Sequence, residues 1–505
     1  MNKAQKKSLI DNILKTCLFS EYLPSEFSTE LLNQAEFSIK SIKLIPPISL
    51  SMDKFNDLDN RRFIAIPEVT SFIHAVQALK EGTILDQLIK LNNDDQHSLS
   101  KILNQKQEIK RFSDGYGFVF ITKDEISSED IADDFLNNLN LKLEKSRSCK
   151  YILHLDIANF FNSIYTHNIS ALIKGESWAN DQFQLSQSGS KRLAKEYSSL
   201  KNIDSKFAEM NLKRTHGLLV GPRLSFIIAE SLLTQIDKEL ASDLAKNNID
   251  FVRFVDDYDV FIKDEKQIRI VKDSFNQILQ KYGLLINDSK TKLEEFPFYT
   301  YIDFETISNE TTDLSNQYAK FGQIEKSKTQ NGALLYFCEN ILSQHTSSNI
   351  ALSLSFSILK NISKALMSSC KNIANFDITE DNSTEIYSLL IDILKEFCEN
   401  HCDLESIWVI YTLLKLFPDF SVEENALCSQ LNEVALVVYM YESKFGIKED
   451  FLKDRAKGCG WLLNYELFYN DIITEDELME NMKITNISSY KQLKDRNIHF
   501  YIKKQ

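Results

Sequence analysis

The spacing of hydrophobic and polar positions divides the chain into two unlike parts. Before about residue 300, short strands alternate with helices. Residues 151–156 form an apolar strand that ends in a carboxylate, and residues 251–256 and 259–263 flank an acidic turn and predict a hairpin. Apolar residues at three-to-four spacing predict helices over residues 1–16, 72–91, 223–244 and 267–282.

After about residue 310 the pattern becomes one helix after another. Helical spacing predicts elements over residues 332–342, 350–367, 384–400, 403–417 and 425–445. There is no strict repeat length, so a stack of helical repeats and a plain helical bundle both fit. We therefore expect an α+β domain over residues 1–310 and an all-α domain over residues 311–505.

Composition favours a water-soluble chain. Of its 505 residues, 43% are hydrophobic and 26% charged, which is ordinary for a globular protein. The longest apolar stretches, such as residues 435–440, fall far short of the ~20 residues that span a bilayer. The N-terminus lacks the continuous apolar core of a secretory signal. These features predict a cytoplasmic protein with no membrane partner.

The eight cysteines are scattered along the chain. Cys398 and Cys402 lie one helical turn apart, which would present two metal ligands on one face. No second pair follows at zinc-site spacing, and free cysteine is among the most buried residue types. Buried structural thiols are therefore the favoured interpretation.

The net charge of −14 is unevenly distributed. Residues 1–300 hold 39 Lys and Arg against 42 Asp and Glu, whereas residues 301–505 hold 19 against 30. A nearly neutral first part can carry a basic groove for phosphates, because local charge decides that contact. The acidic second part is a poor general surface for DNA.

Three acidic residues carry the candidate chemistry. Asp156 ends the first strand, and Asp256 and Asp257 lie in the turn of the hairpin. Adjacent carboxylates need a cation nearby, and their hard oxygens suit Mg²⁺. Two such ions about 4 Å apart activate a 3′-hydroxyl and stabilise a leaving pyrophosphate. The alternative is an exposed acidic turn, but the apolar flanks and the second strand end favour a metal site.

Five blocks, in this order along the chain, resemble those of reverse transcriptases. The blocks are RRFIAIP (61–67), LDIANFFNSI (155–164), GLLVGPRLS (217–225), RFVDDYDVF (253–261) and GLLINDSKTKL (283–293). The resemblance implies a palm and fingers domain. It also implies that Asp156, Asp256 and Asp257 hold Mg²⁺ or Mn²⁺ and catalyse nucleotide addition.

The same resemblance implies a steric gate at Phe161, which would exclude a ribose 2′-hydroxyl and so favour dNTPs. The alternative is a core phenylalanine. The gate is favoured because strand alternation lets Phe160 take the core place.

Further nucleotide contacts are implied at Arg62, Lys54 and Lys290. Arg62 and Lys54 would contact the triphosphate and Lys290 the leaving pyrophosphate; the alternative for each is a solvated surface residue. Gly217 and Gly221 would let the backbone approach the base pair or nucleotide.

Departures from the usual blocks narrow the resemblance. Val220 stands where a Gln normally seats the incoming nucleotide, and Phe226 stands where Pro is usual. With EYLPSEFSTELL (21–32) and the long helical half, the chain resembles the abortive-infection reverse transcriptases of the AbiK type. That resemblance implies a helical-repeat (HEAT-like) second domain, homo-oligomers and a role in phage defence. It also implies template-independent DNA synthesis primed on a protein hydroxyl, with a single-stranded product attached or bound.

Tyr22, in the N-terminal block, is the candidate priming residue, because tyrosine combines a long reach with an acidic phenol. The alternative is a packing aromatic beside Pro24. Two other functions stay open: a templated polymerase of a retron or diversity-generating element, and a catalytically silent helical scaffold.

Overall fold

The computed structural model describes most of the chain. The described residues are 2–34, 44–52, 61–103, 107–109, 138, 141–189, 192, 194–296, 298, 380–421, 430–444 and 449–503. Lys54, the helices predicted over 332–342 and 350–367, and the boundary predicted at residue 310 lie outside these residues.

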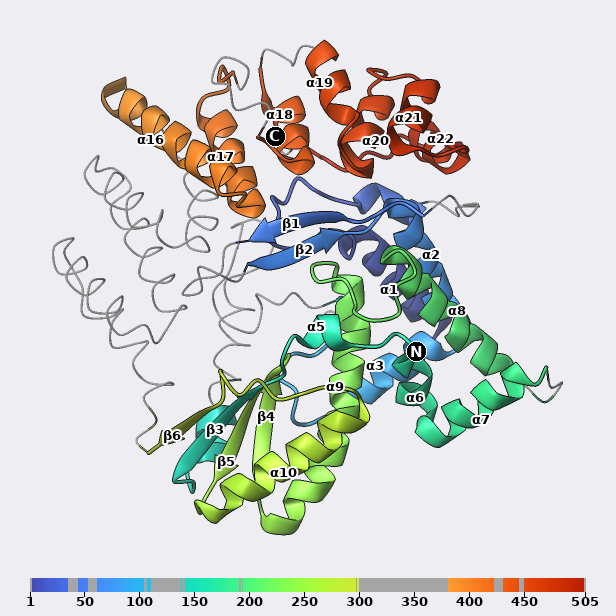
Figure 1. Cartoon of the computed structure of the whole chain (residues 1–505), viewed down its shortest axis with the longest axis vertical. Helices are drawn as coiled ribbons and strands as arrows, with labels where there is room; N and C mark the ends of the chain where they lie inside the picture. The colour runs from blue at the N-terminus through green and yellow to red at the C-terminus, as the bar shows by residue number, and fades with distance from the viewer. Residues whose placement is uncertain are drawn as a thin grey trace.

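A four-stranded antiparallel sheet forms one end of the molecule (Figure 1). Its order is β4 (Asp250–Phe254), β5 (Asp257–Ile262), β3 (Tyr151–Asp156) and β6 (Lys292–Glu295). The strand predicted over residues 151–156 is confirmed with the same bounds. The predicted hairpin is also confirmed, but its two-residue turn is Val255 and Asp256, two positions earlier than the predicted strand bounds imply.

Two long helices support this sheet. α9 (Arg223–Leu244) and α10 (Lys266–Lys281) pack against each other, α9 against β4 and α10 against β5. Both agree with the predicted helices to within one residue. Their apolar faces are buried, as the spacing required, and Gly283 follows α10 with a φ of 71°, which only glycine adopts freely.

The single helix predicted over residues 72–91 is wrong, because the structure has two helices there. α2 (Val69–Lys80) and α3 (Ile84–Asn93) are separated at Gly82, whose φ of 57° breaks the helical path. Apolar residues continue at helical spacing across the break, which is why the pattern did not reveal it.

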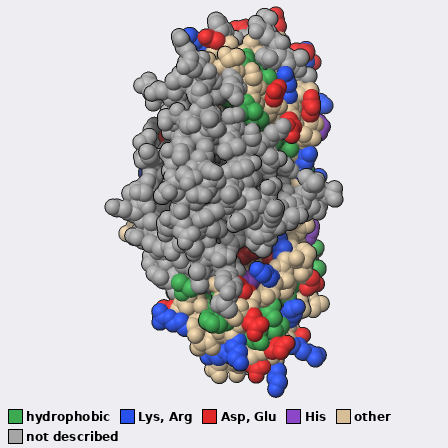
Figure 2. All heavy atoms as spheres, turned by 90° about the vertical axis from the view of Figure 1, so that its left-hand side faces the viewer, with side chains coloured by type: hydrophobic (Ala, Val, Ile, Leu, Met, Phe, Trp, Pro, Cys, Tyr) green, Lys and Arg blue, Asp and Glu red, His purple; other side chains and the backbone are tan. Residues whose placement is uncertain are grey.

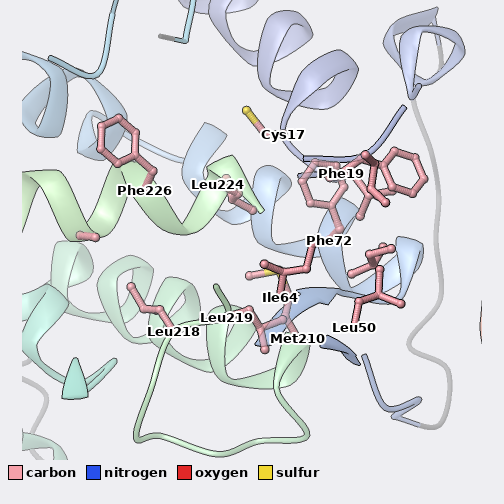
Figure 3. Packing of buried hydrophobic residues seen from close by; sticks show 14 of the residues in the cluster. Cys17, Phe19, Leu50, Ile64, Phe72, Met210, Leu218, Leu219, Leu224 and Phe226 are labelled. Atoms are coloured by element: carbon pink, nitrogen blue, oxygen red, sulfur yellow. The ribbon is translucent and has the colours of Figure 1, made fainter. Parts of the chain in front are cut away.

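A small antiparallel hairpin, β1 (Ile48–Met52) and β2 (Arg62–Ile66), lies between the sheet and the C-terminal helices (Figure 1). The Ala65 N–H donates to the Val220 carbonyl at 2.7 Å, which ties β2 to the segment before α9. Figure 3 shows Leu50 and Ile64 of the hairpin packed in a core with Phe72 of α2.

Shorter helices and turns complete the first part of the chain. They are α1 (Lys3–Thr16), η1 (Glu30–Gln34), α5 (Phe160–Ser163), α6 (Asn168–Lys174), α7 (Glu176–Gln187), α8 (Lys195–Met210) and η3 (Ala245–Asn247).

Every element described after residue 380 is a helix. They are α16 (Glu380–Glu399), α17 (Asp403–Leu416), α18 (Glu433–Glu442), α19 (Glu449–Ala456), α20 (Trp461–Tyr469), α21 (Glu475–Met482) and α22 (Ser488–Asp495). α18 begins eight residues later than predicted, because Asn432 caps it by accepting from the Ala435 N–H at 3.0 Å. Cys398 and Cys402 are buried free thiols, as predicted.

The two ends of the chain interlock. The Ile502 N–H donates to the Glu26 carbonyl at 2.7 Å, and the Ser28 N–H to the Phe500 carbonyl at 3.0 Å. α17 packs against β1, where Asp403 accepts from the Ser51 N–H at 2.9 Å. The buried apolar residues of both parts belong to one contiguous cluster. The C-terminal helices therefore share a core with the hairpin and the N-terminal segment.

On the face shown in Figure 2, the described Lys and Arg side chains lie among Asp and Glu side chains at both ends. Neither end therefore shows a described surface of a single charge sign. Within the described ranges, every helix is too short or too polar to cross a bilayer.

Candidate active site

Strand pairing brings the three predicted carboxylates to one end of the sheet. Asp156, the last residue of β3, pairs directly with Asp257, the first residue of β5. One residue further, the Ile157 N–H donates to the Asp256 carbonyl at 3.2 Å. Residues a hundred positions apart thus meet because β3 and the β4–β5 hairpin end together.

Burial and like charge together set the electrostatics of this cluster. Asp156 is buried, Asp256 is half-buried, and Asp257 reaches solvent on its outer side. Burial, followed by the charge of Asp156, raises the pKa of Asp256. Desolvation by the surrounding protein, followed by the charges of Asp256 and Asp156, raises the pKa of Asp257 to about 7. The ionised forms therefore need a cation to stabilise them.

One cation is supplied by the chain itself. Lys290 Nζ lies 2.5 Å from Asp156 Oδ2, and Asn287 Nδ2 donates to Asp156 Oδ1 at 2.8 Å. The Asn287 N–H also donates to the Asp156 carbonyl at 2.8 Å. Asn287 was not singled out from the sequence, although it stands three residues before Lys290 in the fifth block.

The donor set fits a divalent cation in its chemistry. Carboxylate oxygens are the ligands that Mg²⁺ prefers, and repulsion among these groups favours an added positive charge. Among the described residues, however, no three His, Cys, Asp or Glu side chains are already grouped as a metal site. Lys290 Nζ occupies Asp156 Oδ2, one of the oxygens available to a metal ion. A metal ion would therefore displace this ammonium from Asp156.

Phe161 lies on α5, directly after β3, and is half-buried beside Phe160. Phe160 is buried in the core, and the two ring centroids are 5.5 Å apart. The strand alternation invoked for this pair is wrong, because both residues are helical; the turn of α5 points them to different sides. The Phe161 carbonyl accepts from the Leu218 N–H at 2.8 Å, so the glycine-rich segment holds α5 in place.

The two glycines of that segment approach protein backbone. A Cβ on Gly221, whose φ is 117°, would lie 3.0 Å from the Ala65 carbonyl oxygen. A Cβ on Gly217, whose φ is 91°, would lie 3.2 Å from the Asn162 carbonyl oxygen. The segment between them therefore links α5 to β2, and side chains at these positions would push the elements apart.

Arg62 is exposed at the start of β2. Its positive charge opposes the rise in the pKa of Asp256, which places the guanidinium within electrostatic reach of the cluster. It has the same effect on Tyr22, whose pKa is raised to about 12 by burial and then by the charge of Glu21. The charge of Arg62 therefore acts on both Asp256 and Tyr22.

Residues 84–321, just under half of the chain, match the family model described as reverse transcriptase (RNA-dependent DNA polymerase). This chain contains a reverse-transcriptase domain. It is therefore a nucleotidyltransferase, and the coarser prediction from the sequence blocks is confirmed. Enzymes with this domain bind nucleotides and nucleic acid, and generally use divalent metal ions.

Among solved structures, the chain is similar to two telomerases. The apo telomerase of Candida tropicalis is 15% identical, with 81% of this chain and 70% of that chain covered and a TM-score of 0.31. The telomerase of Candida albicans, in complex with a fragment of telomeric RNA, is 13% identical, with 81% and 68% covered and a TM-score of 0.30. Overlaps this loose carry no conclusion about the present chain. No curated protein matches the sequence.

Proposed function

We propose that this protein is a DNA polymerase that joins dNTPs without a template, primed on one of its own hydroxyl groups, in the cytoplasmic defence of bacteria against phage. The observation that carries the polymerase is the pairing of Asp156 with Asp257 beside Asp256, within a domain that matches reverse transcriptases. The remaining parts of the proposal rest on the residues that depart from the usual reverse-transcriptase blocks.

In this proposal Asp156, Asp256 and Asp257 hold Mg²⁺ or Mn²⁺, which would activate the attacking hydroxyl and stabilise the leaving pyrophosphate. Lys290 neutralises Asp156, and a metal ion bound there would free its ammonium to meet the pyrophosphate. Arg62 binds the triphosphate, since a guanidinium forms paired hydrogen bonds with phosphate oxygens. Phe161 closes the space beside the sugar, so that a ribose 2′-hydroxyl is excluded.

Synthesis without a template is supported by Val220. Its side chain is apolar at the position where a Gln would seat the incoming nucleotide, and its carbonyl is used by Ala65 of β2. Gly221 next to it is packed against the same strand. The segment at residues 217–221 therefore bonds to β2 through its backbone, and it contains no side-chain amide that could contact a base pair.

Priming is proposed at Tyr22. Its oxygen would bond to the α-phosphorus of a dNTP as the bond to the pyrophosphate oxygen breaks, and the phenolic proton would pass to solvent. The phenol is half-buried and its raised pKa disfavours ionisation, so Arg62 is the group that would assist by its charge. Tyr22→Phe is expected to abolish attachment of DNA to the protein; continued attachment would move the priming site elsewhere.

The helical part is proposed to be a HEAT-like stack that assembles the protein into homo-oligomers. Consecutive helices pack on one another from α16 to α17 to α18, and from α20 to α21, as in a repeat stack. Sedimentation of the purified protein tests this part; a monomer at all concentrations would contradict it.

The function is tested by incubating purified protein with labelled dNTPs and Mg²⁺ or Mn²⁺, with no nucleic acid. We expect a labelled ladder that migrates with the protein, is shortened by DNase, and is released as peptide-linked DNA by protease. Asp256→Asn should lose the ladder. The matched control is Asp273→Asn, an aspartate with a 73% exposed side chain that lies on α10 and outside the turn.

Each other outcome selects a different function. Incorporation only after primer and template are added would identify a templated polymerase and overturn the protein-primed proposal. No incorporation by the folded wild-type protein under either condition would favour the helical scaffold.

A further inference from the structure

A buried ionic network lies directly beneath the hairpin turn that carries Asp256. At its centre is Arg253, a β4 residue with 0% of its surface exposed. Both terminal nitrogens of its guanidinium donate to Glu230 at 2.9 Å, and Nε donates to Asp237 at 2.7 Å. Glu230 and Asp237 both come from α9 and are themselves fully buried. A charge buried this completely must be paired, and here a third carboxylate, Asp95, also lies 3.7 Å from Arg253 Nη2.

The turn above this network is strained at Val255. Its φ of 52° lies in the left-handed region, which β-branched residues strongly avoid and which two-residue turns normally fill with glycine. Both backbone groups of Val255 are held from below. The N–H donates to Ser100 Oγ at 2.8 Å, and the carbonyl accepts from Arg253 Nη1 at 2.9 Å.

We propose that Arg253 and Ser100 are positioning residues of the active site, which hold Val255 in its left-handed conformation and thereby direct Asp256 and Asp257 toward Asp156. The inference rests on the proposed function, in which these carboxylates bind the catalytic metal ions. Neither residue touches a substrate; each acts through the backbone of the turn.

The bonding pattern distinguishes this role from simple stabilisation of the core. Glu230 and Asp237 already satisfy the charge of Arg253, so its further bond to the Val255 carbonyl adds a link to the turn. Ser100 also contacts both the network and the turn: its hydroxyl donates to Glu230 Oε2 at 3.1 Å and accepts from the Val255 N–H. Network and turn are thus joined on both sides of one strained residue.

The chain offers a closely matched control. Ser98, two residues before Ser100, also donates its hydroxyl to Glu230, at 2.5 Å, and accepts from the Ser100 N–H at 3.1 Å, but no hydrogen bond joins it to Val255. Ser100→Ala and Ser98→Ala each remove one hydroxyl from the same carboxylate. Only Ser100→Ala also frees the Val255 N–H.

The two variants are compared by hydrogen exchange of the peptide spanning residues 253–258 and by the metal-ion dependence of dNTP incorporation. For Ser100→Ala we expect faster exchange of this peptide and about a tenfold loss of incorporation at fixed metal concentration, partly recovered at higher concentration. Ser98→Ala should match it in melting temperature but leave both readouts near wild type. Equal effects of the two variants on exchange and metal dependence would overturn the proposal.

Val255→Gly supplies the second measurement, because glycine adopts the left-handed conformation without being held there. In the Val255→Gly variant, adding Ser100→Ala should reduce dNTP incorporation less than it does in the wild-type protein. An equally large reduction would also overturn the proposal. A wild-type protein that incorporates no dNTP would instead defeat the proposed function, and the exchange data would then show separately whether Ser100 holds the turn.

Discussion

Lys290 and Asp156 form the closest ion pair of the active site, although 134 residues separate them along the chain. The Asp156 side chain is 6% exposed and the Lys290 side chain 45%. The pair therefore lies at the edge of the protein, where the lysine can leave without stranding its charge in the core. In the proposed function, Lys290 would withdraw in this way when a metal ion binds.

The charge of Lys290 also opposes the raised pKa values of Asp256 and Asp257. Lys290→Gln should raise both pKa values further, because the carboxylates lose a neighbouring cation. Metal binding needs the ionised forms, so the rate of incorporation should fall by roughly tenfold near pH 7 and recover as the pH rises. The measurement is a pH–rate profile of dNTP incorporation.

Lys292→Gln is the matched control for this profile, since Lys292 is exposed on β6 and lies two residues further on. A parallel loss at every pH in Lys290→Gln would show that the lysine acts on the nucleotide and leaves the ionisation of the carboxylates unchanged.

At the scale of elements, the glycine-rich segment at residues 217–221 sets the distance between α5 and β2. It bonds to both through its backbone, so its position decides how far Arg62 stands from Phe161. The contacts of Gly221 are the tightest of the segment, with backbone atoms of β2 on the other side. Backbone atoms cannot rotate away as the end of a long side chain can.

Gly221→Ala should therefore destabilise the protein by about 1–3 kcal/mol and weaken dNTP binding, because the added methyl group pushes β2 and Arg62 outward. The free energy of unfolding in urea and the KM for dNTPs measure the two effects. Gly175→Ala is the control: its φ of 87° also lies where L side chains strain the backbone, but nothing lies within 4 Å of the new methyl group. If both variants raise KM equally, the contact with β2 is not the cause.

At the scale of the whole molecule, the C-terminal helices are tied to the first hundred residues by buried polar contacts. Glu68 caps α2 by accepting from the Thr70 and Ser71 N–H groups, and it also accepts from the Tyr490 hydroxyl of α22 at 2.7 Å. Tyr411 of α17 donates to Glu26 in the same manner. Such pairs make folding of the two parts interdependent, because separation would strand a carboxylate or a hydroxyl without its partner.

Tyr490→Phe should lower the free energy of unfolding by about 1–3 kcal/mol, since the buried Glu68 loses a hydrogen-bond donor. Urea unfolding, followed by both fluorescence and circular dichroism, should remain a single transition. Tyr469→Phe is the control, because among the described residues the Tyr469 hydroxyl makes no hydrogen bond. Two separate transitions would contradict the shared core.

Much of the architecture follows from short-range patterns. Alternation predicted β3 to the residue, and helical spacing predicted α9 and α10, because a strand or helix that buries one face must repeat at its own period. The order of the blocks indicated the reverse-transcriptase domain. The pattern failed at Gly82, where apolar residues keep the helical period through a break that one backbone angle decides.

The sequence by itself determined β3, the hairpin, α9 and α10, and the carboxylates at the ends of the strands. The tertiary structure alone decided that Asn287 and Lys290 hold Asp156, that Arg253 and Ser100 hold Val255, and that the helices after residue 380 share a core with the N-terminal segment. Each of these depends on polar groups or apolar faces brought together from distant parts of the chain. Local periodicity shows which face of an element is buried. It does not show which other element packs against that face, because that depends on the tertiary structure.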